Sequence, residues 1–380
     1  MPNSRVAVGL VLTSFDPGGT ERQMTELIAR LDRARFDVHV ACFRREGHWL
    51  PRVEAAALSV TEFPISGFRS PSTLAQLLAF ARWCRERRLA VVQACDFYAN
   101  VFALPGAALA RVPVRLGSRR DLVLPGRSAG QHRLQRWAYR LAHRIVANSQ
   151  AAAQQVAAEG IPESRVTVIP NGVDLRTFGP PHPRTAGPPN LRTITTVANL
   201  RPEKGHDVLL EAAARVVRTH PDVQFQFVGD GPMRSTLEQR ARAMDLGGRV
   251  AFLGHREDVP ELLANCTLFV LPSRSEAFPN GLVEAMAAGV PAIASGVGGI
   301  LELIQHERNG LLAPVGDGVA LADAIVSLLD DPGTAERLGA HARQTIESRY
   351  SFDRMVGAFE ALYLNQLAGS RFPIHALAAR

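Results

Sequence analysis

Short apolar runs alternate with longer amphipathic segments along most of this 380-residue chain, and no other feature restricts its fold as strongly. The short runs are typical of buried strands, and the amphipathic segments are typical of helices that cover a parallel sheet on both faces. The alternation stops in a segment rich in Pro and Gly at 179–189 and then begins again. A segment of that composition indicates a linker, because it holds no regular element.

We therefore predict an α/β chain of two Rossmann-like, doubly wound domains that face each other across a cleft. The first domain is predicted at 1–179, the linker at 180–190, the second domain at 191–351, and a helix and tail that cross back to the first domain at 352–380. Sheets of this kind bind ligands at the carboxyl ends of their strands. Strands are predicted at 5–12, 37–41, 90–93, 112–117, 145–148 and 166–169, and then at 193–198, 223–228, 250–253, 268–271 and 291–294.

Composition and charge narrow the functions that remain. The chain is 46% hydrophobic, which excludes a disordered protein. Residues 1–180 carry 24 arginines and 14 acidic residues, a net charge of +10 that attracts phosphates or acidic lipids, or merely keeps the surface solvated. No apolar stretch is long enough to cross a membrane, no signal peptide is recognisable, and the four cysteines include no CxxC pair. We expect a cytoplasmic protein, in at most loose contact with an anionic inner membrane face, that binds no nucleic acid.

The segment 273–291 carries the strongest chemical signal. Glu276 lies in a polar loop after a strand, and Asn280 is predicted to be the N-cap of the following helix. The free backbone N–H groups of 280–282 would then form an anion site. Glu284, in the predicted first turn, can accept two hydrogen bonds from a diol such as a ribose. Taken alone, Glu284 is equally explained as a charge that favours the start of a helix.

Two further turns follow the opening strand of each predicted domain. In the second domain, Arg201 and Lys204, the only lysine of the chain, lie three residues apart in a turn fixed by Pro and Gly. Two such cations can clamp a diphosphate, although a solvated turn is the commoner explanation of the pattern. In the first domain, Gly18 and Gly19 would let the backbone approach a phosphate or a sugar, or simply form a tight turn. Neither a GxGxxG nor a Walker A motif is present, which disfavours dinucleotide or ATP binding.

Polar residues also end two neighbouring strands of the first domain. Asp96 follows one predicted strand, and Arg119 and Arg120 follow the next. Because parallel strands end at the same sheet edge, these three residues are predicted to line an acceptor pocket. Asp96 is equally suited to be the N-cap of the helix that follows it.

The ordered set of motifs resembles the family-4 retaining glycosyltransferases, which have the GT-B fold. Glu276 and Glu284 match the EX7E motif of that family. The resemblance extends almost from end to end of the chain, through the motifs at 18–23, 147–149, 169–174, 201–205, 228–232, 271–273 and 297–299.

The resemblance implies roles for these residues. Arg201 and Lys204 neutralise the diphosphate of a nucleotide-sugar donor, Glu284 holds its ribose, and Glu276 with the following backbone grips the transferred sugar. The family needs no metal or other cofactor, and this chain has no DxD motif or clustered metal ligands. The catalytic residues implied are Glu276, Arg201 and Lys204, and those that bind the donor are Gly18, Gly19, Arg201, Lys204, Glu276, Ala277, Phe278, Pro279, Asn280, Gly281, Leu282 and Glu284.

Two positions depart from the family pattern. Ala277 stands where the family usually has Gly, which narrows the sugar pocket or alters its preference. The strand that ends at 93–95 reads Gln-Ala-Cys where many members carry a histidine, so the acceptor-side role of that histidine is unfilled unless Asp96 takes it.

The function predicted is a retaining, metal-independent transfer of a sugar from a UDP- or GDP-linked donor to a hydroxyl of a sugar or lipid-linked sugar, in polysaccharide or glycolipid assembly. Three alternatives stay open. A glycoside hydrolase also uses two carboxylates, but it needs no cations for a diphosphate. A nucleotide-sugar epimerase needs no acceptor, and a binding protein of the same fold would hold the nucleotide without turnover.

Overall fold

The computed structural model describes residues 5–65, 67, 70–122, 128–179 and 191–369. Contacts divide the chain into two units, one up to Gly172 together with the segment from Phe352 onward, and one from Val173 to Ser351. Residues 173–179, which the sequence assigned to the first domain, belong to the second unit. The linker predicted at 180–190 lies outside the described residues.

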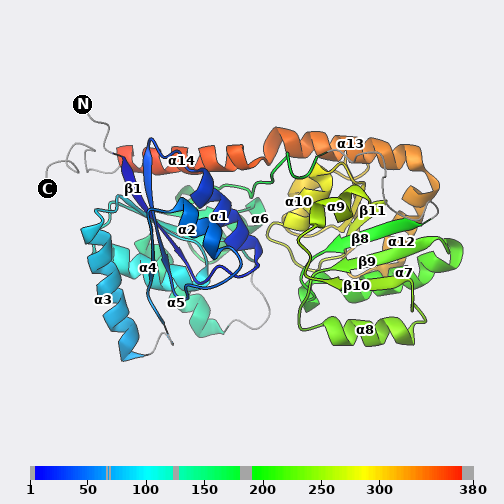
Figure 1. Ribbon diagram of the computed structural model, residues 1–380, viewed down its shortest axis with the longest axis horizontal. Coiled ribbons are helices and arrows are strands. Elements are labelled where there is room, and N and C mark those ends of the chain that lie inside the picture. Colours follow the sequence, from blue (N-terminus) through cyan, green and yellow to red (C-terminus); the bar gives the residue numbers. More distant parts are fainter. Residues whose placement is uncertain (1–4, 66, 68–69, 123–127, 180–190, 370–380) are drawn as a thin grey trace. The chain divides into compact units, whose positions relative to one another are not determined.

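Unit 1 is built on a parallel sheet whose order, over the described residues, is β3-β2-β1-β4-β5-β6-β7. The strands are β1 (Val6–Leu12), β2 (Phe36–Cys42), β3 (Ser59–Glu62), β4 (Val91–Ala94), β5 (Val114–Arg119), β6 (Arg144–Ala147) and β7 (Val166–Val168). The helices are α1 (Gly19–Arg30), α2 (Leu50–Ala56), α3 (Pro71–Glu86), α4 (Phe97–Leu109), α5 (Ala129–Leu141), α6 (Gln150–Ala158) and α14 (Phe352–Gly369), with a 3₁₀ turn η1 (Glu163–Arg165). Helices on both faces bury the strands (Figure 1).

The last helix belongs to the core of unit 1. Phe359 and Tyr363 of α14 are fully buried in the same cluster as Leu10 of β1. The Tyr363 hydroxyl donates a hydrogen bond of 2.6 Å to Gln93 Oε1 on β4. Burial of this apolar face and one buried hydrogen bond therefore fix α14 against the sheet.

Unit 2 repeats the arrangement with the sheet order β10-β9-β8-β11-β12-β13 over its described residues, all parallel. The strands are β8 (Arg192–Val197), β9 (Val223–Val228), β10 (Val250–Gly254), β11 (Leu268–Leu271), β12 (Ala292–Ser295) and β13 (Leu311–Ala313). The helices are α7 (His206–Thr219), α8 (Arg234–Ala243), α9 (Val259–Ala264), α10 (Asn280–Ala287), α11 (Ile300–Leu303), α12 (Gly318–Asp330) and α13 (Pro332–Arg349), with a 3₁₀ turn η2 (Pro202–Lys204).

Both sheets reverse their winding direction beside the first strand, between β1 and β4 in unit 1 and between β8 and β11 in unit 2. Such a switch point opens a crevice at the carboxyl ends of the strands, which is where ligands bind in this kind of sheet. The predicted fold class of two Rossmann-like domains is confirmed, whereas the facing of the two domains across a cleft stays a prediction. None of the helices in the described part of the chain is both long and apolar enough to cross a membrane.

Candidate functional site

The only lysine and the first glutamate of the EX7E motif meet in unit 2. Lys204 Nζ lies 2.6 Å from Glu276 Oε1, and the Ser273 hydroxyl donates to the same oxygen at 2.8 Å. The Glu276 backbone oxygen accepts a 2.9 Å hydrogen bond from Gly299 N. Because Glu276 is only 5% exposed, its charge needs these partners. The sequence predicted Lys204 and Glu276 at one site but gave Ser273 no role.

Close packing of two loops brings this pair together. Gly205 has φ of 65°, and a Cβ there would overlap the carbonyl oxygen of Pro272, so the position requires glycine. The Arg274 guanidinium donates two hydrogen bonds of 2.7 Å to the Asp207 carboxylate. Arg274 N also donates to Glu203 O at 2.8 Å. This bidentate clamp, which the sequence analysis missed, ties the turn after β8 to the loop after β11.

Helix α10 places the rest of the motif at the same sheet edge. A Cβ on Gly281 would overlap the carbonyl oxygen of Val197, so the first turn of α10 lies directly against the end of β8. The prediction for the helix start was wrong in detail. Pro279 is the N-cap and Asn280 is the first helical residue, because the extended backbone at Pro279 turns into the helix without a side-chain cap.

Glu284 therefore lies in the second turn of α10 rather than the first. Glu284 is only 6% exposed, so its side chain is buried rather than solvated at the surface. The intervening positions Ala277, Phe278, Pro279 and Leu282 are buried, and Asn280 and Gly281 are half-buried. The segment 277–282 is thus packed, with its backbone at the carboxyl ends of β8 and β11.

Arg201 and His206 lie on either side of Lys204. Arg201 is exposed and forms no ion pair with any described residue, so its guanidinium is available to an anion. His206, the first residue of α7, is 2% exposed, and neither ring nitrogen has a hydrogen-bond partner within the part of the chain that the structure describes. Burial and, to a smaller extent, the charge of Lys204 lower the pKa of His206 to about 4. The ring is therefore neutral near pH 7 and packs 5.5 Å from Phe227.

In unit 1 the predicted glycine turn forms the start of α1. Gly18 is the N-cap and Gly19 is the first helical residue. The Glu21 carboxylate folds back over Gly18, where a Cβ would overlap it. Burial raises the pKa of Glu21, and the nearby Asp96 and Asp16 charges act in the same direction. Sequence reasoning missed Glu21, although a glutamate three residues after a helix N-cap is the spacing of a capping box.

Asp96 is the N-cap of α4, as one of its two predicted roles required. Its carboxylate accepts hydrogen bonds from Ala99 N at 2.9 Å, from Thr13 N at 2.8 Å and from the Thr13 hydroxyl at 2.9 Å. Burial raises the pKa of Asp96 in spite of these bonds, which favour the carboxylate. Cys95, where many family members have histidine, is fully buried, and Gln93 is engaged by Tyr363.

Arg119 does not line a pocket, and that prediction was wrong. Its side chain is fully buried and turns to the helices behind the sheet, where Nη1 donates to Gln135 Oε1 at 3.0 Å and Nη2 pairs with Glu159. Arg120 differs from its neighbour. Its Nη2 donates to Asn171 Oδ1 at 2.5 Å, whereas its buried Nε and Nη1 have no hydrogen-bond partner among the described residues. Burial lowers the pKa of Arg120 to about 10, so it remains charged near neutral pH.

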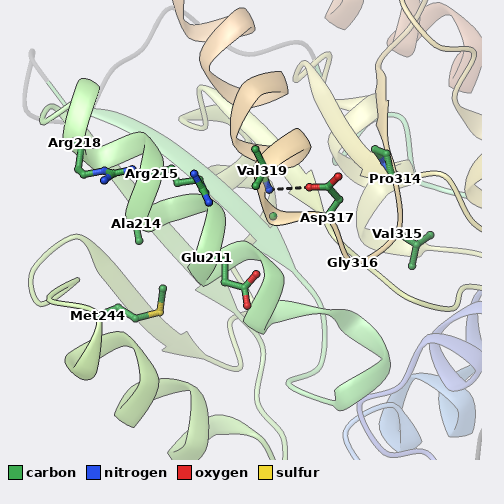
Figure 2. A pocket seen from close by; sticks show the side chains of 11 residues that line it. Glu211, Ala214, Arg215, Arg218, Met244, Pro314, Val315, Gly316, Asp317 and Val319 are labelled. Atoms are coloured by element: carbon green, nitrogen blue, oxygen red, sulfur yellow. Dashed lines mark hydrogen bonds between the residues drawn. The ribbon is translucent and has the colours of Figure 1, made fainter.

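A separate open pocket of about 890 Å³ lies between α7, α12 and the end of α8 in unit 2. Figure 2 shows that none of the predicted site residues lines it. Its two carboxylates are already used, since Glu211 pairs with Arg240 and Asp317 accepts from Val319 N and Ala320 N. The residues predicted to bind a donor therefore lie outside this pocket.

Comparison with known protein families agrees with this geometry. The model described as "Glycosyltransferase Family 4" matches residues 17–177, and the model described as "Glycosyl transferases group 1" matches residues 182–345. Together they cover the strands, turns and helices that carry the predicted site. The chain therefore belongs to glycosyltransferase family 4.

Individual relatives sharpen the comparison. The chain is 37% identical over 176 residues to N-acetyl-alpha-D-glucosaminyl L-malate synthase of Bacillus anthracis, over 46% of each chain. It is 30% identical over 213 residues to an Escherichia coli UDP-Gal:alpha-D-GlcNAc-diphosphoundecaprenol alpha-1,3-galactosyltransferase, over 53% of this chain and 55% of the relative. The chain thus spans about half the length of these curated relatives.

A solved structure matches over nearly the whole length. The Anabaena protein HepE in complex with UDP and glucose superimposes with a TM-score of 0.81 and 25% identity, over 93% of this chain and 98% of that one. The likeness includes both units, so it supports the two-domain architecture.

Proposed function

We propose that this protein is a retaining glycosyltransferase that moves a sugar from a UDP- or GDP-linked donor to an acceptor hydroxyl in polysaccharide or glycolipid assembly. The observation that carries the proposal is the meeting of Lys204, Glu276 and the start of α10 at the switch point of the unit 2 sheet. The names of the relatives, which include a sugar-malate synthase and a UDP-galactose-dependent transferase, support the same reaction class.

The donor is held by charge and by backbone. Arg201, which has no ion pair within the described chain, and Lys204 bind the two phosphates, and the N–H groups at the start of α10 add a favourable dipole. Glu284 accepts the ribose hydroxyls. Glu276, held in place by Lys204 and Ser273, accepts hydroxyl hydrogen bonds from the sugar. The buried methyl of Ala277 sets a limit to the sugar that fits beside it.

The transfer itself is a substitution at the anomeric carbon. The bond from that carbon to the phosphate oxygen breaks, and a bond to the acceptor oxygen forms on the same face. The acceptor proton passes to the departing phosphate oxygen. Arg201 and Lys204 stabilise the charge that grows on the diphosphate, and a preorganised cation of this kind is worth about 10²–10³-fold in rate. No metal or other cofactor is needed, because side-chain cations carry this charge.

On the acceptor side we assign Arg120 rather than Arg119. Arg120 has two buried N–H groups without partners, and a buried donor left unpaired is costly. An anionic group of the acceptor would satisfy them. The named relatives act on L-malate and on a diphosphate-linked sugar, both of which carry negative charge beside the accepting part. Exchange of Arg120 for Gln should raise the acceptor KM more than it lowers kcat.

The experiment that tests the donor site is a thermal-shift panel. UDP, GDP, ADP and their common sugar conjugates are added to the wild type with Mg²⁺ or with EDTA. A ligand at 100 times its Kd adds about 2.7 kcal/mol of stability, which is readily seen. One nucleotide should stabilise the protein equally with and without metal, and Lys204→Ala and Glu284→Ala should lose the effect. A panel in which no nucleotide shifts the Tm, or in which both variants respond like the wild type, contradicts the proposal.

The single lysine offers an independent check. An amine-directed acetylating reagent can modify only Lys204 and the chain terminus, and Lys204 is 23% exposed beside Glu276. The donor nucleotide should protect Lys204 from acetylation, read by mass spectrometry, while the terminus reacts unchanged.

An activity assay distinguishes sugar transfer from hydrolysis, epimerisation and simple binding, because only transfer releases the nucleoside diphosphate in a way that depends on an acceptor. Retention is read from the anomeric proton signal of the product.

A further inference from the structure

A second and smaller pocket of unit 2 contains none of the residues predicted to bind a donor. Its volume is about 280 Å³, and it is lined by the turn at 305–309 and by residues 341–349 of α13, the orange helix of Figure 1. We call it the α13 pocket. Among the described residues that line it, every side chain is polar and none is a carboxylate. This composition suits a small anion, because no acidic side chain repels its charge.

Two arginines supply the positive charge of the α13 pocket. Arg308 belongs to the turn, and Arg349 belongs to the last turn of α13. Both side chains are exposed, and neither forms an ion pair with a described residue. Arg343 of the same helix differs, because it pairs with Glu347 at 2.7 Å. Guanidinium groups that no carboxylate occupies can offer paired N–H donors to the oxygens of an oxyanion.

The open pocket of Figure 2 provides a comparison within the same unit. Arg215 and Arg218 line that pocket, but Glu211 and Asp317 line it as well, and Met244 adds an apolar side chain. The two carboxylates there offset the two positive charges. The α13 pocket is smaller, but its arginines have no such counter-charges on the lining. Of the two pockets, the α13 pocket is therefore the better suited to an anion.

Hydrogen bonds hold the turn of the α13 pocket in place. Asn309, which is 3% exposed, donates to the Thr345 hydroxyl at 3.1 Å and accepts from Gln305 N at 2.7 Å. Arg308 Nη1 donates to Gln305 Oε1 at 2.9 Å. His341 Nδ1 lies 3.0 Å from the Arg308 backbone oxygen, which can only accept, so Nδ1 carries the hydrogen. Binding of a ligand here therefore requires little further ordering of the chain.

We propose that the α13 pocket binds a phosphate group, either free or carried by a small hydroxylated molecule. Ligand sites span about 300–1,000 Å³, and a pocket at the small end of that range leaves too little room for a nucleotide sugar. A phosphate dianion matches the charge of two arginines, whereas a neutral sugar would leave both without a counter-charge. The Gln344 amide and His341 Nε2, which is free to accept a hydrogen bond, can bind the hydroxyls of a phosphate ester.

Helix α11 lies between this pocket and the Glu276 loop. Asn309 Nδ2 donates to the backbone oxygen of Leu303, the last residue of α11, at 3.0 Å. At the other end of α11, Gly299 N donates to Glu276 O at 2.9 Å. The α13 pocket is thus near the predicted donor residues but shares none of them. The inference therefore goes beyond the proposed function, and phosphate and nucleotide can bind to the same molecule.

The test is isothermal titration calorimetry of the full chain with inorganic phosphate, at constant ionic strength. Phosphate can also enter the predicted donor site, so the parent protein for every titration is the Arg201→Gln/Lys204→Ala variant. One phosphate should bind per chain with a Kd of about 1 mM or tighter. Glycerol 3-phosphate should bind as well, and glycerol should not.

The two phosphate sources are distinguished by the ester. Tighter binding of glycerol 3-phosphate than of phosphate, reduced to the phosphate level by Gln344→Ala, would show that the pocket also recognises the hydroxyls. Equal binding of the two would identify a site for the phosphate group alone. Both results support the inference, because the phosphate group is the shared part.

Variants assign the binding to the α13 pocket. Arg308→Gln and Arg349→Gln should each raise the Kd for phosphate about tenfold, and the two together about a hundredfold, because each removes charge-assisted hydrogen bonds. The matched control is Arg215→Gln with Arg218→Gln, the two arginines of the open pocket, and its Kd should equal that of the parent. The Tm without phosphate verifies that each variant is folded.

Three outcomes overturn the inference. They are the absence of binding heat for both phosphate and glycerol 3-phosphate, an unchanged Kd in the Arg308 and Arg349 variants, and an equal loss in the control. The nucleotide panel uses the wild type in buffer without phosphate. A failure of either experiment therefore leaves the conclusion of the other standing.

Discussion

The carboxyl edges of the two sheets use similar residues in different ways. At the edge of unit 2, Lys204 and Glu276 neutralise each other next to the half-exposed start of α10, and Arg201 keeps its charge unpaired within the described chain. At the edge of unit 1, Asp96 is occupied as a helix cap and Arg119 is occupied in a buried ion pair. Arg120 retains two buried nitrogen donors without hydrogen-bond partners in the described chain, whereas Arg119 retains one, Nε, which lies 3.6 Å from Asp121 Oδ1.

This difference shows that a polar residue at the end of a strand does not necessarily bind a ligand. Its role depends on whether the fold already uses all of its hydrogen-bonding groups. In unit 2 the groups are oriented but still open to a ligand, whereas in unit 1 most of them hold the fold together. The predictions below test that division, and they run from the largest expected effect to the smallest.

The largest effect is expected for Arg119→Met. The change leaves the Glu159 carboxylate, which is 14% exposed, without its buried partner. Breaking one side of a buried ion pair costs about 3–5 kcal/mol. Urea unfolding should report this loss, while the activity per folded molecule stays close to that of the wild type. The control is Arg133→Gln, at an exposed arginine of the same unit.

A second variant separates structure from acceptor binding at this position. Adding Glu159→Gln to Arg119→Met removes the orphaned charge and should restore part of the stability. If Arg119→Met instead keeps full stability and raises the acceptor KM, then the fold does not use Arg119 as described and it belongs to the acceptor site.

The second largest effect is expected at the carboxyl edge of the unit 2 sheet. Lys204→Met should lower kcat/KM for the donor by about 10²–10³-fold, because a cation that meets the growing phosphate charge is removed. Arg240→Gln is the matched control, since Arg240 pairs with Glu211 on the outer surface of the same unit. Initial rates of nucleoside diphosphate release decide the matter. Equal losses in both variants would show that general charge, rather than the position of Lys204, drives the reaction.

The sequence predicted the regular elements of this fold well where local signals were strong. Strand β9 was predicted over the residues that it occupies, because apolar and polar residues alternate there between Val223 and Phe227. The strand β3, with the sequence Ser-Val-Thr-Glu, was missed because it is short and lies at the sheet edge. Strand β13 was missed as well, since it has three residues and also lies at a sheet edge.

The site could be predicted only in part. Spacing in the sequence brought Lys204 and Glu276 to one place, since both follow the central strands of one sheet. The direction of a side chain depends on neighbours that are remote in sequence. The side chain of Arg119 points into unit 1 because it donates hydrogen bonds to Gln135 and Glu159 there. Asp207 contributes to the site because it accepts hydrogen bonds from Arg274. No pattern local to Arg119 or Asp207 reports such partners.

A smaller effect is expected from pH, through His206. Its pKa is about 4 in the folded chain against an ordinary value of 6.5. The unfolded chain therefore binds the proton more readily between these values, so stability falls as pH is lowered from 6.5 towards 4. The loss is about 2–3 kcal/mol, at 1.36 kcal/mol for each pKa unit. From urea unfolding, the stability of the wild type should fall by this amount relative to that of His206→Phe as the pH is lowered across this window.

His143 in unit 1 gives the comparison a control. Its pKa is also lowered to about 4, chiefly by burial and then by Arg115 and Arg165, but its ring already accepts a hydrogen bond from Arg115 N at 3.0 Å. His143→Gln should leave the pH response of unit 2 unchanged. Identical pH profiles for wild type and His206→Phe would show that the ring at 206 finds a proton-accepting partner in solution.

The smallest effect tests whether Asp96 is a cap or an acceptor-side base. Asp96→Asn keeps the cap of α4, but its amide NH2 group cannot accept the hydrogen bond that Thr13 N donates to Oδ2, so it should cost about 1–2 kcal/mol of stability, as Asp96→Ala should. If the carboxylate only caps α4 and holds Thr13, both variants keep the wild-type kcat. If it takes the role of the histidine that the resemblance implies at 93–95, both variants lose kcat as well as stability. The carboxyl edge of the unit 1 sheet would then also carry a side chain that acts on the substrate. The two edges would differ only in how many of their polar side chains do so.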